Sequence, residues 1–212
     1  MMNNETDSSG TNPAFWLRLA LWLVVGTMAY NAAEAVLALW AGIRAHSIAL
    51  VGFGADSMIE LAAAAVLLWR LRVEARGADD ETVERTERRV HLFVGVTFLL
   101  LSVYVLWQSA LTLLAREAPS ESILGIVLAA ASLAIMPLVS WGKLRAAREL
   151  GSRALRAEAL ETLACSYLSF TLLLGLVLNA TAGWWWADPL AALLMVPWLV
   201  HEGVEGLRGD DD

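Results

Sequence analysis

The stretch SIALVGFGADSMIELAAAAVLLWR, residues 47–70, is apolar almost throughout and yet carries two carboxylates near its middle. It is long enough to cross a bilayer as a helix, which takes about 20 residues. Asp56 and Glu60 are four residues apart, so both lie on one helical face, one turn apart. A carboxylate at the centre of a membrane costs roughly 2.5–3.5 kcal/mol on insertion scales. Because of this cost, we expect the pair to have a function.

Two like charges this close in a medium of low polarity require a cation or protons. The pair accordingly predicts a metal site and, when no metal is bound, protonated carboxyls. The same two residues also fit a proton relay, or hydrogen bonding that holds neighbouring helices together.

The composition of the whole chain is that of a polytopic membrane protein. Of its 212 residues 58% are hydrophobic and the mean hydropathy is +0.58, whereas a soluble domain is about 45–50% apolar. We predict an all-α fold, a bundle of six transmembrane helices. The expected crossings are residues 14–40, 47–71, 90–114, 123–141, 157–180 and 188–204.

The segments outside this bundle are short. Residues 1–13 are polar and are predicted to be a disordered cytoplasmic tail. They are not expected to be a cleavable signal peptide, because they lack its basic start. Residues 14–207 form the predicted transmembrane domain, and residues 208–212 a short acidic tail with no soluble domain after it. No basic surface suggests a nucleic-acid partner; the net charge of −7 comes largely from the tails and from carboxylates within helices.

The positions of the basic residues predict the orientation. Of the 15 Lys and Arg residues, 13 fall on the side shared by the termini, the 72–89 connection and the connection that follows residue 141. Arg44 and Arg116 fall on the other side. Because basic residues stay in the cytoplasm, both termini are predicted to be cytoplasmic, in an inner membrane.

The 72–89 connection mixes acidic and basic residues around Gly77. This pattern predicts solvated extensions of the two flanking helices, and a regulatory metal site here is the less favoured reading. Residues 143–156 form a basic connection.

A second polar pair lies in the fifth crossing. Glu161 and Cys165 repeat the i, i+4 spacing of the first pair, and Glu158 lies one turn earlier. Two helices that each present two ligands one turn apart match the four-ligand tetrahedron of zinc. A thiolate favours Zn²⁺ or softer ions over Mg²⁺ and Ca²⁺. A lone cysteine in a membrane helix is also commonly a small apolar packing residue.

The remaining polar residues have supporting roles in this interpretation. Glu158 is expected at the cytoplasmic interface, paired with Arg156 or Arg153. Asn31 and Glu34, three residues apart in the first crossing, fit either hydrogen bonds to the ligands, a proton path, or bonds between helices. Three histidines are expected at helix ends, at the membrane interface: His46, His91 and His201.

Three stretches together resemble the cation diffusion facilitator family of proton-coupled exporters of zinc and related divalent metals. They are AGIRAHSIALVGFGADSMIE (residues 41–60), RALRAEALETLACSYLS (153–169) and GWWWADPLAALLMVPWLVHEGVEGLR (183–208). In that family the second helix carries Asp or His followed by Asp four residues later; these positions are Asp56 and Glu60 here. The fifth helix carries His or Asp followed by Asp; these positions are Glu161 and Cys165. Glu158 matches a polar position before that pair.

The resemblance implies a Zn²⁺ exporter, with Cd²⁺ as a further cargo, that exchanges metal for protons by alternating access and needs no prosthetic group. It also implies a homodimer, which would form through the membrane helices because the family's cytoplasmic domain is not expected here. Cys165 and Glu161 depart from the usual residues, so metal selectivity does not transfer. The alternative is a membrane metal-binding or sensory protein that does not transport; a membrane metalloenzyme is disfavoured, since no pattern of an activated nucleophile is present.

Overall fold

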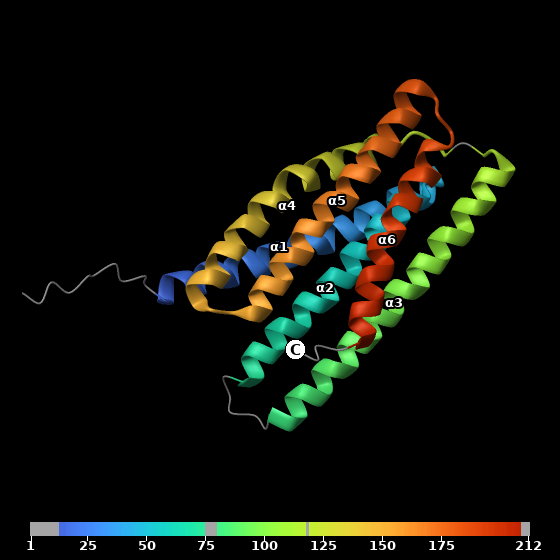
Figure 1. Cartoon of the computed structure of the whole chain (residues 1–212). Coiled ribbons are helices and arrows are strands. Elements are labelled where there is room, and N and C mark those ends of the chain that lie inside the picture. Colours follow the sequence, from blue (N-terminus) through green and yellow to red (C-terminus); the bar gives the residue numbers. More distant parts are fainter. Residues whose placement is uncertain (1–12, 75–79, 118, 209–212) are drawn as a thin grey trace, which may run out of the picture.

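The computed structural model describes residues 13–74, 80–117 and 119–208, and these residues form a bundle of six helices without a strand (Figure 1). The helices are α1 (Pro13–Ala45), α2 (Ile48–Glu74), α3 (Asp80–Ala115), α4 (Ile123–Leu150), α5 (Arg153–Ala182) and α6 (Ala187–Arg208). Each contains a segment long and apolar enough to cross a membrane. The predicted all-α fold with six crossings is confirmed.

Every helix runs beyond its predicted apolar span, because charged residues at the membrane surface still propagate a helix while water satisfies their side chains. The clearest case is α4, which continues to Leu150. Gly151 ends it in a left-handed conformation, with φ of 63°. Ser152 then caps α5 by accepting a hydrogen bond from the N–H of Leu155. The predicted basic connection therefore lies mostly within α4 and α5.

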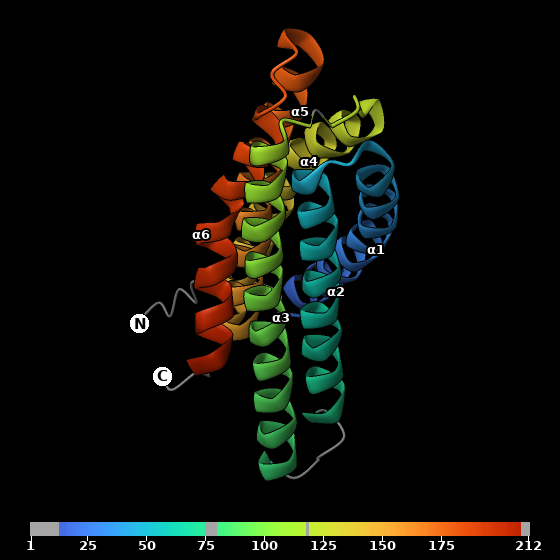
Figure 2. The same cartoon turned by 90° about the vertical axis from the view of Figure 1, so that its right-hand side faces the viewer.

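The predicted extensions of α2 and α3 are confirmed as helical, since α2 continues to Glu74 and α3 begins at Asp80. Figure 2 shows the two helices running side by side beyond the end of α6. Three segments lie outside the described residues: 75–79, which includes Gly77, and residues 1–12 and 209–212 of the tails predicted at 1–13 and 208–212. Pro13 and Arg208, the inner residues of those tails, belong to α1 and α6.

The helices pack most extensively in the pairs α1–α2, α3–α6 and α4–α5. Small residues allow close approach, as is usual between membrane helices. A Cβ added at Gly175 would come within 2.6 Å of the Cβ of Ala191, so glycine is required where α5 meets α6. Large apolar side chains such as Trp107 and Leu138 are exposed on the outside of the bundle, where lipid would surround them.

The start of α2 is tied to the start of α6. The hydroxyl of Ser47 donates to the carboxylate of Asp188, and the backbone N–H of Ile48 donates to Asp188 Oδ2 over 2.8 Å. Asp188 is only 1% exposed. This cap holds the N-terminal end of α2, and so helps to determine the depth at which Asp56 and Glu60 lie.

Candidate metal site

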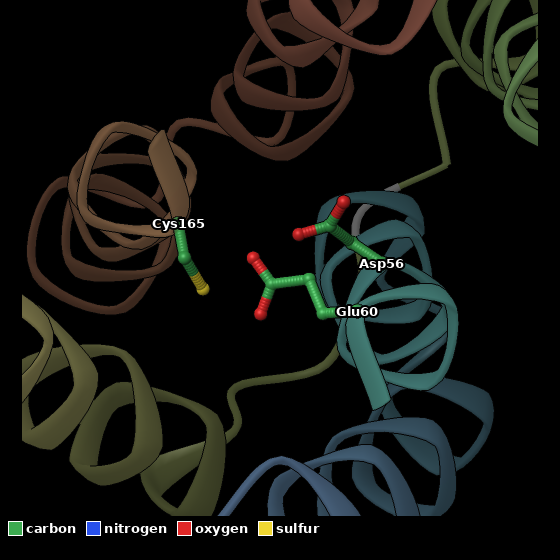
Figure 3. Close-up of side chains that lie close together, drawn as sticks. All are labelled: Asp56, Glu60 and Cys165. Carbon is green, nitrogen blue, oxygen red and sulfur yellow. The ribbon is translucent and has the colours of Figure 1, made fainter. Parts of the chain in front are cut away.

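Asp56, Glu60 and Cys165 come together in the interior of the bundle. One carboxylate oxygen of each acid and the sulfur of Cys165 all lie within 4.8 Å of one another. In Figure 3 the Glu60 carboxylate extends from α2 toward Cys165 on α5, with the Asp56 carboxylate beside it. Asp56 and Cys165 are buried, and Glu60 is half-buried.

The geometry follows from the helices that carry these residues. The i, i+4 spacing places both acids on the face of α2 that packs toward α5. Three protein ligands around one point leave a fourth coordination position open, which is typical of zinc sites that exchange a ligand. Two hard oxygens and one soft sulfur suit Zn²⁺ and Cd²⁺ better than Mg²⁺.

One oxygen of this group has no hydrogen-bond partner. Asp56 Oδ2 is buried and accepts no hydrogen bond from any of the described residues. A buried acceptor left unpaired costs about 1–3 kcal/mol, and more if it is charged. Asp56 therefore offers a strong acceptor to a cation or a proton.

Asn31 and Glu34 of α1 both bond to α2. Asn31 Nδ2 donates to Glu60 Oε2 over 2.8 Å. Ser57 Oγ donates to Glu34 Oε2 over 2.9 Å. Asn31 thus orients a candidate ligand directly, whereas Glu34 contacts the neighbour of Asp56 in sequence. Both bonds also hold α1 against α2. Asn31 thus combines two of the three predicted roles, a bond to a candidate ligand and a bond between helices, while the proton path stays a prediction.

Glu161 is not in the group of three. It lines a pocket of about 10 Å³ next to the group, roughly the space of one water molecule. The residues around this pocket come from α1, α2 and α5: Thr27, Asn31, Glu60, Ala64, Glu158, Glu161 and Thr162. The axial register of α5 against α2 explains the difference, because it brings Cys165 level with the two acids and leaves Glu161 one turn nearer the start of α5.

Glu158 has a buried partner that was not expected. Its Oε1 accepts a hydrogen bond from Lys143 Nζ over 2.6 Å. No bond to Arg156, one of the two expected partners, is found among the described residues, and the side chain of the other, Arg153, lies outside them. The same ammonium donates to Thr162 Oγ1 over 3.0 Å.

Lys143 is fully buried and Glu158 is 8% exposed. The lysine belongs to α4 because that helix continues past its predicted end and lies along α5. Lys143 is spaced by three or four residues from Ser140 and Ala147, which are buried on the same face of α4 as Met136. This helical spacing in the sequence could have indicated that Lys143 is buried.

A second group of potential ligands lies on α6, and the expectation that His201 is merely interfacial missed it. Ligand atoms of His201, Glu202 and Glu205 lie within 4.8 Å of one another. His201 Nε2 is 3.4 Å from Glu205 Oε2, an i, i+4 pair, and both side chains are about two-thirds exposed. Water competes strongly at such a surface. His46 is exposed between α1 and α2 as expected, and the side chain of His91 lies outside the described residues.

The sequence model of the cation efflux transmembrane domain matches residues 24–208. The chain belongs to the cation efflux family. An uncharacterized transporter of Synechocystis sp. is 30% identical over 171 residues, which are 78% of this chain and 55% of the relative. The chain thus spans about half the length of that relative. The resemblance to cation diffusion facilitators is confirmed at the level of the family, and the protein is a multi-pass membrane protein of a transporter family.

Proposed function

We propose that this cation efflux protein exports Zn²⁺, and also Cd²⁺, in exchange for protons. One observation carries the proposal. Ligand atoms of Asp56, Glu60 and Cys165 lie within 4.8 Å of one another in the interior of a bundle of apolar helices. Ionisable residues at membrane depth typically mark an ion pathway. The family match supports cation transport, and the ligand set supports the choice of cargo.

The four candidate ligands have distinct roles in this proposal. Asp56 and Glu60 bind the ion through oxygen, and Cys165 binds it through sulfur. Glu161, in the adjoining pocket, or a water molecule supplies the fourth ligand. Asn31 keeps the Glu60 carboxylate oriented through its 2.8 Å hydrogen bond.

Proton exchange follows from the chemistry of these ligands. Carboxyl and thiol groups must lose their protons to bind a metal, so metal affinity rises with pH and metal binding releases protons. Protons that arrive from the acidic side of the membrane compete for the same atoms and release the ion. The site then faces each side in turn, as in transporters with a central binding site.

The proposal includes the membrane arrangement. Residues 14–207 form the transmembrane domain, the termini are in the cytoplasm and the membrane is the inner membrane, in agreement with the 13-to-two distribution of basic residues. The protein acts as a homodimer that associates through its membrane helices.

Reconstitution of the purified chain into liposomes tests this function. A Zn²⁺ gradient across the membrane should drive Zn²⁺ flux and an opposite proton flux, each followed by a trapped fluorescent indicator. Asp56→Ala should abolish both, whereas Glu149→Gln, an exposed carboxylate on α4, should retain both. Zn²⁺ binding without any flux would instead identify a membrane metal sensor. Full flux in Asp56→Ala would refute the site.

A further inference from the structure

The pocket beside the three-residue group is lined by oxygen atoms rather than sulfur. Its polar residues are three carboxylates (Glu60, Glu158, Glu161), one amide (Asn31) and the hydroxyls of Thr27 and Thr162. Hard divalent cations prefer oxygen ligands of this kind. The neighbouring group, in contrast, includes the sulfur of Cys165.

Two acceptors around the pocket have no partner among the described residues. Asn31 is 2% exposed, and its Oδ1 accepts no hydrogen bond while its Nδ2 is bonded to Glu60. Glu158 is 8% exposed, and its Oε2 is likewise unpaired although Oε1 is bonded to Lys143. Buried acceptors are nearly always satisfied, so each of these requires an explanation. Both residues line the pocket, so a cation bound there would be a candidate partner for the two atoms.

The formal charge around the pocket also suits a divalent ion. The three carboxylates contribute three negative charges, and the ammonium of Lys143 contributes one positive charge from its position between Glu158 and Thr162. These four groups together carry a net formal charge of −2, which favours a cation over a neutral molecule in the pocket. The volume of about 10 Å³ holds one particle the size of a water molecule, so the cation must shed most of its hydration shell.

The pocket lies on one definite side of the three-residue group. Its α2 residue Ala64 follows Glu60 in sequence, and its α5 residues precede Cys165. Both directions lead to the end of the bundle where α2 and α4 end and α5 begins (Figure 1). Glu60 belongs to the pocket and to the group, and therefore links them.

We propose that the protein has a second cation position in this pocket, formed by oxygens of Glu60, Glu158, Glu161 and Asn31. It takes a hard divalent cation, for which Mn²⁺ is a probe. The ion passes between this position and the Asp56–Glu60–Cys165 group through the shared Glu60 carboxylate; this passage rests on the proposed transport function, whereas the binding position does not.

Two probes separate the positions in the purified full chain in detergent. Mn²⁺ binding is measured by the loss of its free-ion electron paramagnetic resonance signal. Cd²⁺ binding is measured by the charge-transfer absorption that appears only when cadmium binds a thiolate. Glu161→Gln should weaken Mn²⁺ binding at least tenfold. The Cd²⁺ absorption should persist, because it requires only the bond between cadmium and the Cys165 thiolate and a water molecule can replace Glu161 as the fourth ligand. Cys165→Ser should eliminate the Cd²⁺ absorption and leave Mn²⁺ binding within threefold of wild type.

Two further variants control for misfolding. Ala64→Val adds volume at the wall of the pocket without changing any charge, and it should weaken Mn²⁺ binding as Glu161→Gln does. Glu149→Gln removes an exposed carboxylate and should change neither signal.

The outcomes distinguish the two proposals. Loss of both signals in Glu161→Gln and in Ala64→Val would mean a single site in which Glu161 is the fourth ligand, and would overturn the second position. Mn²⁺ binding that is unaffected by both variants would also overturn it. A Cd²⁺ absorption that is absent in the wild type would refute the thiolate site of the proposed function, while the Mn²⁺ series would still decide the pocket.

Discussion

Asp56 in the middle of α2 and Asp188 at the start of α6 are two buried aspartates, and they differ in what surrounds them. Both are 2% exposed or less. Asp188 accepts hydrogen bonds from the Ser47 hydroxyl and from the N–H of Ile48 at the start of α2. Asp56 Oδ2, in the middle of the bundle, has no partner among the described residues. A buried carboxylate with its hydrogen bonds complete ties helices together, whereas one left incomplete is available to a cation.

Glu158 is intermediate between these two cases, because its Oε1 is bonded to Lys143 and its Oε2 has no partner among the described residues. Loss of its partner Lys143 should have the largest effect on stability. Lys143→Met removes the cation that satisfies its Oε1. Breaking one side of a buried ion pair costs about 3–5 kcal/mol, because a buried charge loses its partner. We expect a corresponding fall in the free energy of unfolding, measured by denaturant titration in detergent.

The double variant Lys143→Met/Glu158→Gln is the control for this prediction. It removes both charges and should recover most of the lost stability. If the single variant is as stable as the wild type, the pair does not contribute as a buried ion pair.

Asp56→Asn tests the unsatisfied carboxylate. The amide keeps the shape of the side chain but removes the charge that binds the cation, so Zn²⁺ flux in liposomes should fall about 100-fold, equivalent to about 2.7 kcal/mol. Thermal stability in detergent should stay the same or rise, because a buried charge has been removed. A large loss of stability together with flux would assign Asp56 a structural role like that of Asp188.

Asp188→Asn is the matched change at the satisfied carboxylate, and we expect the opposite result. Ser47 and Ile48 donate to different oxygens of the carboxylate, and the amide replaces one of these acceptors by a donor, so one of the two hydrogen bonds is lost in the present geometry. The free energy of unfolding should fall by about 1–3 kcal/mol. Zn²⁺ flux per folded molecule should change less than threefold. An Asp188→Asn protein of normal stability and no flux would place this residue in the transport pathway.

Ser57→Ala is expected to have the smallest effect. It removes the 2.9 Å hydrogen bond from Ser57 Oγ to Glu34 Oε2 between α2 and α1. A bond to a charged acceptor contributes about 1.5–3 kcal/mol at most, and a neutral one about 1 kcal/mol. We expect a loss of about 1 kcal/mol in stability and a change of flux below threefold. A loss of flux as large as that of Asp56→Asn would place Ser57 and Glu34 on the proton path.

Patterns in the sequence predict those features of the structure that depend on a single helix. The apolar spans predict six crossings because each must match the thickness of the membrane. The spacing of four residues predicts that Asp56 and Glu60 share a face, and that Glu161 and Cys165 share another, since this depends only on 3.6 residues per turn. The end of α4 at Leu150 was not predicted, because the expected span stopped at residue 141 with the apolar run, although Gly151 and Ser152 mark the boundary in the sequence. The buried position of Lys143 was harder to find, because a basic residue near the end of an apolar span usually reaches the membrane surface.

The sequence by itself therefore determined the all-α membrane class, the family motifs and the pairs of polar residues on each helix. Only the tertiary structure decided how those pairs meet. Periodicity specifies the angle of a side chain around its own axis, but not the axial offset between two helices. That offset, which depends on packing between helices and on ties such as Asp188 at the start of α2, brings Cys165 to Asp56 and Glu60 and leaves Glu161 in the oxygen-lined pocket with Glu158.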